Sequence, residues 1–200
     1  MPRITHVKKA RKSPGVCGRC VETIEKGQGY YWFQPYHSTK RVWCEKHYPR
    51  QSELTQSDKL STAYAAVESI EDAVVEFDRI GVAALDDKDA LIGGVEELKS
   101  VIEAAKEEIE QVASDYRDSK DNMPESLQDG PTGQEIEEKA DALEQYAQEL
   151  DEITSDLKYV ISDIENEIGD QKLDEVGDWL KEKHAEASAI VTDKSGNLSL

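Results

Sequence analysis

The feature that most constrains the fold is a stripe of apolar residues that recur at alternating steps of four and three positions. This period places every member on one face of an α-helix. A lone helix would expose such a stripe to water, so the pattern predicts a long helix packed against a partner helix. The stripe comprises Leu91, Val95, Leu98, Ile102, Ala105, Ile109, Val112 and Tyr116.

Similar stripes precede and follow this one. The earlier stripe comprises Leu60, Ala63, Val67, Ile70, Val74, Phe77 and Gly81, and the later one Ile136, Ala140, Leu143, Ala147, Leu150, Thr154, Leu157, Ile161, Ile164 and Ile168. A shorter helix is expected to carry Leu173, Val176, Leu180, Ala187 and Ile190. Short turns favour an antiparallel helical hairpin or bundle within one chain. An intermolecular coiled coil, and therefore a homodimer, stays open.

The expected helix limits follow from local signals. Thr55 with Asp58, and Thr132 with Glu135, have the spacing of capping boxes. Breaks are expected at Asp86–Asp89 and at Asp121–Gly133, where two prolines and two glycines disfavour a helix.

Charge divides the chain into two parts. Residues 1–56 hold 11 Lys/Arg and 4 Asp/Glu, whereas residues 57–200 hold 13 and 39. We therefore expect a basic module at 1–56, an acidic helical bundle or coiled-coil hairpin at 57–191 and a flexible polar tail at 192–200. The two parts carry opposite net charges and are therefore expected to bind different partners.

The basic part has the residues of a small β structure. The segments 29–34 and 40–44 are rich in aromatic and β-branched residues and flank a turn-prone stretch, so they predict a β-hairpin. The predicted fold class is α+β and mainly α, with a small zinc-stabilised β-hairpin module before long antiparallel helices.

Two close pairs of metal ligands occur in this part. Cys17 and Cys20 form a C-x2-C pair, and Cys44 and His47 form a C-x2-H pair. Two such pairs are what a tetrahedral Zn2+ site needs, and four protein ligands leave no position for an activated water. The site is therefore interpreted as structural. His37 is an alternative fourth ligand.

These residues resemble a known class of zinc finger. Cys17-x2-Cys20, Lys26-Gly27, Tyr30, Trp32 and Trp43-Cys44-x2-His47 are similar to small treble-clef and PARP-like fingers, particularly those of bacteriophage proteins of unassigned function. The resemblance covers about residues 8–56 and implies a phage accessory protein in the host cytoplasm. The PARP finger has His before its last Cys, whereas here Cys44 precedes His47, which argues against recognition of DNA breaks.

A nucleic-acid or nucleoprotein partner is predicted for the basic module. Its candidate phosphate contacts are Lys8, Lys9, Arg11, Lys12, Arg19, Lys40, Arg41 and Arg50. Aromatic residues such as Tyr30, Trp32 and Tyr36 are candidates for base stacking, although burial in the small core explains most of them better.

An alternative function belongs to the acidic helices. Rows of carboxylates present a phosphate-like field, so these helices are candidates to inhibit or adapt a host or phage protein that has a basic surface. A solvated acidic face is the simpler interpretation.

No enzyme is predicted, because the carboxylates are too numerous to identify a site and His184 has no nucleophile near it in the sequence. The sequence predicts no membrane span, and an odd number of cysteines fits a reducing cytoplasm better than a disulfide framework.

Overall fold

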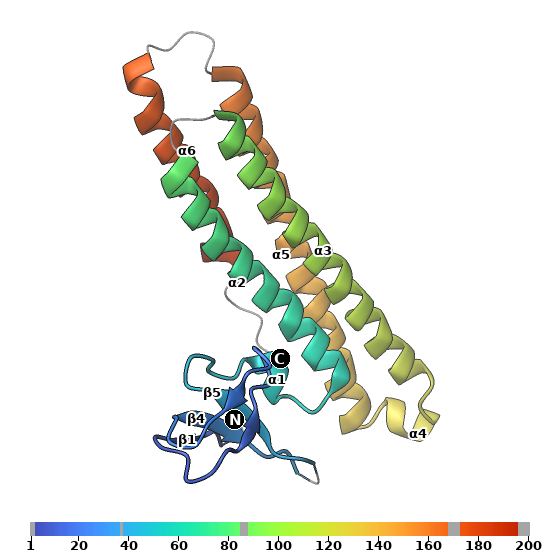
Figure 1. Cartoon of the computed structure of the whole chain (residues 1–200). Helices are drawn as coiled ribbons and strands as arrows, with labels where there is room; N and C mark the ends of the chain where they lie inside the picture. Colours follow the sequence, from blue (N-terminus) through green and yellow to red (C-terminus); the bar gives the residue numbers. More distant parts are fainter. Residues whose placement is uncertain (1–2, 37, 85–87, 168–172, 196–200) are drawn as a thin grey trace. The chain divides into compact units, whose positions relative to one another are not determined.

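A computed structural model of the chain describes residues 3–36, 38–84, 88–167 and 173–195 (Figure 1). It is an α+β fold that is mainly α, with small antiparallel sheets before long helices, as the sequence predicts. The chain divides into two compact units, Met1–Ser61 and Thr62–Leu200, which we call the head and the bundle. The division falls inside helix α2 (Asp58–Ala84), slightly later than the expected boundary at residue 56.

The head is built on a three-stranded antiparallel sheet. Strands β4 (Tyr30–Phe33) and β5 (Arg41–Cys44) form the predicted hairpin, with Tyr31 opposite Trp43. Strand β1 (Thr5–Val7) pairs with the other edge of β4, giving the order β1-β4-β5. Strand β1 was not predicted, because three residues are too few to show a period.

A second, two-stranded ladder carries the first cysteine pair. Strands β2 (Gly15–Val16) and β3 (Thr23–Ile24) are antiparallel, and the turn between them contains Cys17 and Cys20. The short helix α1 (Gln51–Leu54) follows the second ligand pair. The buried core of the head is Cys17, Ile24, Phe33, Val42, Trp43 and Leu54.

The centre of the bundle is an antiparallel pair of helices, α3 (Lys88–Asp121) and α5 (Pro131–Glu167). Every member of the stripe from Leu91 to Tyr116 is buried, as predicted. Ion pairs from Lys106 to Asp151 and from Arg117 to Glu144 fix the opposite directions of the two helices. The short helix α4 (Glu125–Gln128) lies in the expected turn.

Helix α5 buries more than its predicted stripe. Tyr146, Ile153 and Val160 are also buried, at steps of seven residues. They widen the apolar face because α5 contacts α6 (Leu173–Ser195) as well as α3. At the far end of α6, the Tyr146 hydroxyl donates a hydrogen bond of 2.8 Å to the buried carbonyl of Ser195.

Three predicted helix limits are wrong. Helix α2 begins after Ser57, whose hydroxyl accepts from the Leu60 N–H, so Thr55 is not the cap. Helix α5 begins at Pro131, a residue suited to a first helical position, which places Thr132 inside the helix. Helix α6 continues to Ser195, four residues into the expected flexible tail, because Val191 and Ser195 are buried.

Helix α2 buries Ala63, Ala66, Ile70 and Phe77. The Phe77 ring stacks on His184 of α6, with ring centroids 4.5 Å apart. His184 thus has a packing role. Over the described residues, no helix combines the length and apolar character that a membrane crossing requires.

Candidate metal centre

The first ligand pair lies in a tight turn between β2 and β3. The Val21 N–H donates to the carbonyl of Cys17, and the Cys17 N–H donates to the carbonyl of Glu22. Val21 adopts a left-handed φ of 58°, which is uncommon for a β-branched residue and shows how tightly the turn is wound. The turn is tied to the main sheet because the Gly18 N–H donates to the carbonyl of Val42.

The second ligand pair lies where β5 ends. Cys44 is the last residue of β5, and the His47 N–H donates back to its carbonyl, which turns His47 toward the cysteine. A Cβ added to Gly18 would lie 3.3 Å from the indole nitrogen of Trp43, so the first turn approaches β5 closely. The two pairs therefore face each other across a well-packed junction.

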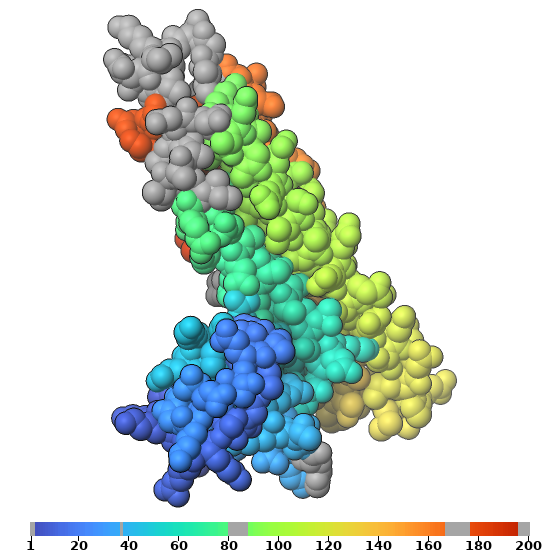
Figure 2. Space-filling view, in the orientation of Figure 1, coloured from blue at the N-terminus to red at the C-terminus, as the bar shows by residue number. Residues whose placement is uncertain are grey.

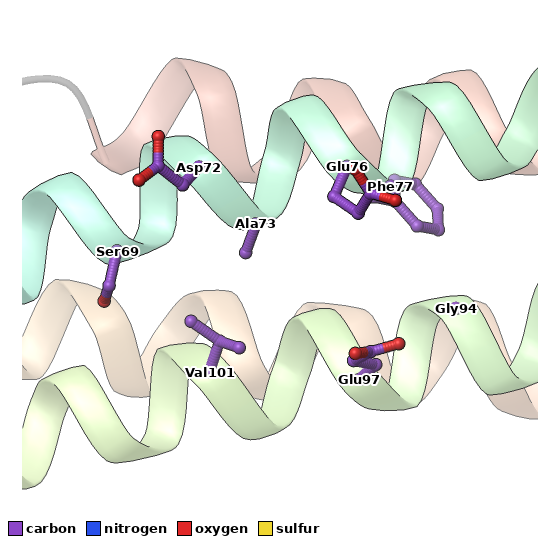
Figure 3. A pocket seen from close by; sticks show the side chains of 8 residues that line it. All are labelled: Ser69, Asp72, Ala73, Glu76, Phe77, Gly94, Glu97 and Val101. Carbon is purple, nitrogen blue, oxygen red and sulfur yellow. The ribbon is translucent and has the colours of Figure 1, made fainter. Parts of the chain in front are cut away.

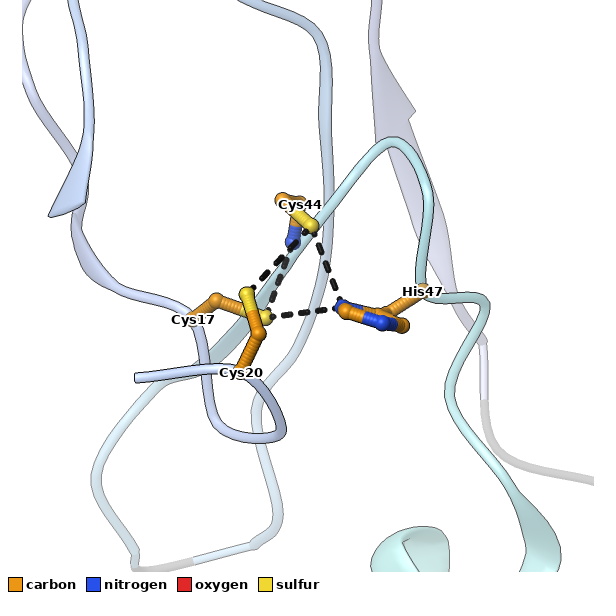
Figure 4. A group of neighbouring side chains, drawn as sticks. All are labelled: Cys17, Cys20, Cys44 and His47. Atoms are coloured by element: carbon orange, nitrogen blue, oxygen red, sulfur yellow. Dashed lines mark hydrogen bonds between the residues drawn. The ribbon is translucent and has the colours of Figure 1, made fainter. Parts of the chain in front are cut away.

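The four predicted ligands meet at one point (Figure 4). Their donor atoms all lie within 4.8 Å of one another, and the histidine presents Nδ1. The Cys20 and Cys44 sulfur atoms are 3.9 Å apart, and Nδ1 lies 3.2 Å from Cys44 Sγ and 3.6 Å from Cys17 Sγ. Metal–sulfur bonds of about 2.3 Å at tetrahedral angles separate two sulfur atoms by roughly 3.8 Å. The group could hold a metal ion.

Local hydrogen bonds prepare Cys17 to act as a thiolate. Burial alone would raise the pKa of its thiol, but three backbone N–H groups and the His47 side chain outweigh burial and lower the pKa from 9.0 to about 6. The backbone donors belong to Arg19, Cys20 and Cys44. A metal-ligating cysteine needs this kind of thiolate stabilisation.

Cys20 shows the opposite tendency. The backbone of Glu22 favours its thiolate, but desolvation and the nearby sulfur atoms of Cys17 and Cys44 together raise the pKa of the thiol. Three adjacent thiolates repel one another unless a cation lies between them. The electrostatics thus agree with the geometry in favouring a bound cation.

The charged residues of the head fall into two groups. Arg19 and Arg41 serve the fold. Arg19 forms a two-pronged ion pair with Glu53, at 2.6 and 3.3 Å, and also donates to the carbonyl of Tyr48. Arg41 donates to the carbonyl of Glu53.

Glu53 is the important residue of the head that sequence reasoning missed. Desolvation would raise its pKa, but hydrogen bonds from Arg19, from the Arg50 N–H and from the Trp43 side chain keep the pKa below its usual value of 4.5. It joins α1 to the first ligand turn through Arg19 and to β5 through Trp43. A signal was present in the sequence, since Glu53 is one of only four acidic residues in the basic part.

The second group of cations is exposed and lies on one loop, which contains Lys8, Lys9, Arg11 and Lys12. This loop is held in place, because Ala10 is buried, its N–H donates to the carbonyl of Gln28 and its carbonyl accepts from the Gly27 N–H. The basic segment therefore belongs to the folded head.

Lys40 has a different environment. Its ammonium lies 4.1 Å from the ring centroid of Trp32 and 5.3 Å from that of Tyr30, which are half-buried on one face of β4. Tyr36 is 81% exposed. Most aromatic residues of the head thus contribute to its core or border, while Tyr36 and Tyr48 stay at the surface.

Of the two candidate fourth ligands, the structure brings His47 to the cysteines, and His37 lies outside the described residues. No protein-family model, curated protein or solved structure matches this chain. The likeness to phage zinc fingers accordingly stays a prediction.

Proposed function

We propose that the head is a zinc-stabilised module that binds nucleic acid through its basic loop. The observation that carries the proposal is the loop of four exposed cations fixed at Ala10 to the folded head. Neither zinc binding nor nucleic-acid binding requires the protein to be an enzyme.

Zinc is the metal that suits the donor set. Three thiolates and one imidazole are soft and borderline ligands, and four such donor atoms within 4.8 Å of one another suit a structural zinc site. With four protein donors the coordination shell is full, so the ion would stabilise the fold without activating water. It would connect the β2–β3 turn to the end of β5.

Phosphate is the chemistry that suits the loop. Lysine and arginine side chains bind phosphates as charges, and a loop fixed by backbone hydrogen bonds loses less entropy on binding than a free arm would. Val7 pairs with Tyr30, so the loop starts beside the face that carries Trp32 and Tyr30. A strand bound at the loop would thus have aromatic rings close by for stacking.

The test is fluorescence anisotropy of labelled single-stranded and duplex oligonucleotides, titrated with the full zinc-loaded chain at 50–200 mM salt. Lys9→Ser/Arg11→Ser is compared with Lys158→Ser/Lys181→Ser, a control that removes the same charge from exposed positions on the bundle. The loop variant should bind about tenfold more weakly, with a salt slope reduced by about 1–2, whereas the control should change affinity less than threefold.

Two results would count against nucleic-acid binding. One is no binding by the wild-type protein at 50 mM salt. The other is an equal loss of affinity in the loop variant and the control, which would show that only the net charge of the chain matters.

A further inference from the structure

The bundle contains a pocket between α2 and α3 that no role of the head uses (Figure 3). The surfaces of these two helices meet along the face seen in Figure 2. The cavity has a volume of about 370 Å3, which is within the size range of small-ligand sites. Its lining residues are Ser69, Asp72, Ala73, Glu76, Phe77, Gly94, Glu97 and Val101.

Small side chains create the pocket. The Phe77 ring fills the space above Gly94, where an added Cβ would lie 3.3 Å from the ring. One turn earlier on α2, Ala73 faces α3 with a single methyl group, and Val101 points toward it from the other side (Figure 3). The space between these side chains is therefore open and its interior is apolar.

The rim of the pocket is acidic. Glu97 of α3 lies at the opening between the helices, and Glu76 lies beside Phe77 (Figure 3). Glu76 has a partner in Arg79, at 2.7 Å, whereas Glu97 forms no ion pair with any residue that the structure describes. The Asp72 carboxylate points away from α3 (Figure 3).

We propose that this pocket binds an organic cation, namely an ammonium or guanidinium group on a short apolar stem. The stem would lie against Ala73, Phe77 and Val101, and the charge would pair with Glu97 at the rim. No lysine or arginine lines the pocket, and residues 57–200 carry 39 acidic against 13 basic residues, so the local field favours cations and repels anions.

This site is independent of the nucleic-acid role, because it lies within the bundle and uses residues of opposite charge. Binding of an organic cation here could therefore succeed or fail without affecting the proposal for the head.

The test uses a matched series of probes in a 1H–15N NMR titration of the full chain. Phenethylammonium supplies both the apolar stem and the charge, 2-phenylethanol supplies the stem alone, and phenylacetate reverses the charge. A ligand of this size is expected to bind with a Kd of roughly 0.1–1 mM. The amide signals of Ala73, Gly94 and Val101 should shift when phenethylammonium binds. 2-Phenylethanol should bind at least fivefold more weakly, and phenylacetate should cause no shift.

Two variants separate the charge from the cavity. Glu97→Gln should weaken binding of the cation three- to tenfold, while Glu108→Gln, an exposed change on the same helix, should leave it unchanged. Ala73→Leu should fill the cavity and abolish binding while the helical circular dichroism is kept. If Ala73→Leu unfolds the chain, the wild-type amide signals that shift with phenethylammonium and the comparison of Glu97→Gln with the wild type still test the proposal.

A last arm distinguishes the source of the cation. Acetyl-Leu-Lys-Leu-amide presents the same chemistry on a peptide, and tighter binding of this peptide than of phenethylammonium would assign the site to a side chain of a partner protein. Tighter binding of the free amine would assign it to a small molecule. Equal binding of phenethylammonium and 2-phenylethanol, or unchanged binding by Glu97→Gln, would overturn the proposal.

Discussion

The head and the bundle are stabilised in different ways. The head buries six residues in its core, and one of them, Cys17, is also a candidate metal ligand. The bundle buries long apolar stripes along α3 and α5, with many side chains fully removed from water. A unit of about 60 residues buries a smaller fraction of its surface than a larger one does, and a metal often supplies the missing stability. The two units should therefore lose their structure under different conditions.

The largest expected effect is the loss of a ligand. His47→Ala removes one of the four donors, and structural zinc sites contribute on the order of 10 kcal/mol to folding. The 1H–15N NMR signals of the head should collapse to those of an unfolded chain while those of the bundle persist. His6→Ala is the matched control, because His6 stacks on Tyr31 at the sheet surface without joining the ligand group. A head that stays folded in the His47→Ala variant would contradict the proposal that the head, unlike the bundle, depends on a metal for its stability.

The next effect belongs to the bundle. Leu150 of α5 is fully buried in the predicted stripe, and Leu150→Ala should cost about 2–5 kcal/mol through lost burial and the cavity left behind. Denaturant unfolding followed by helical circular dichroism measures this cost. The head signals should stay unchanged below the transition of the bundle, and their simultaneous loss would show that the units unfold as one.

A smaller effect is expected at Glu53, which joins α1 to the first ligand turn and to β5. Glu53→Gln removes the charge that Arg19 and two N–H donors stabilise, at a cost of about 1–3 kcal/mol to the head. Because the folded pKa is below the unfolded value of 4.5, this stability is present above that value and is lost as pH falls through the folded pKa.

At pH 7 the head should therefore be more stable in the wild type than in Glu53→Gln. This difference in stability should shrink below pH 4.5. Denaturant unfolding of the head with zinc in excess, followed by the 1H–15N NMR signals of the head at several pH values, measures this difference. A difference that does not depend on pH would assign the effect to shape rather than charge.

The smallest effect concerns the end of α6. Burial, together with the charges of Glu149 and Glu71, raises the pKa of Tyr146 to about 12, so its hydroxyl stays protonated and donates to Ser195 at neutral pH. Tyr146→Phe removes this hydrogen bond and should cost about 1–2 kcal/mol. Hydrogen exchange should accelerate in the last turns of α6, and an unchanged rate there would show that apolar packing alone holds the helix end.

Periodicity in the sequence predicted the long helices well, because a stripe such as Leu91 to Tyr116 repeats over many turns. It did not predict the second face of α5, since Tyr146, Ile153 and Val160 acquire a role only when α6 packs there. The two-residue strands β2 and β3 pair over a short separation, Gly15 with Ile24 and Val16 with Thr23, but two residues are too few to show a period.

The candidate metal centre was predictable for a similar reason. The ligand spacing of Cys17, Cys20, Cys44 and His47 is local and repeats one turn geometry, so the sequence identified all four. Which basic residues pair within the fold and which stay exposed was not predictable. Whether Arg19 meets a phosphate or Glu53 depends on a contact between residues 34 positions apart, which no local pattern encodes.

The most direct test measures the metal content of the purified full chain and then the effect of removing the metal. Mass spectrometry under native conditions should find one zinc ion per chain, and a strong chelator should unfold the head while the helical signals of the bundle remain. A chain that contains no stoichiometric metal and keeps a folded head in chelator would contradict the claim that a metal ion holds the head together.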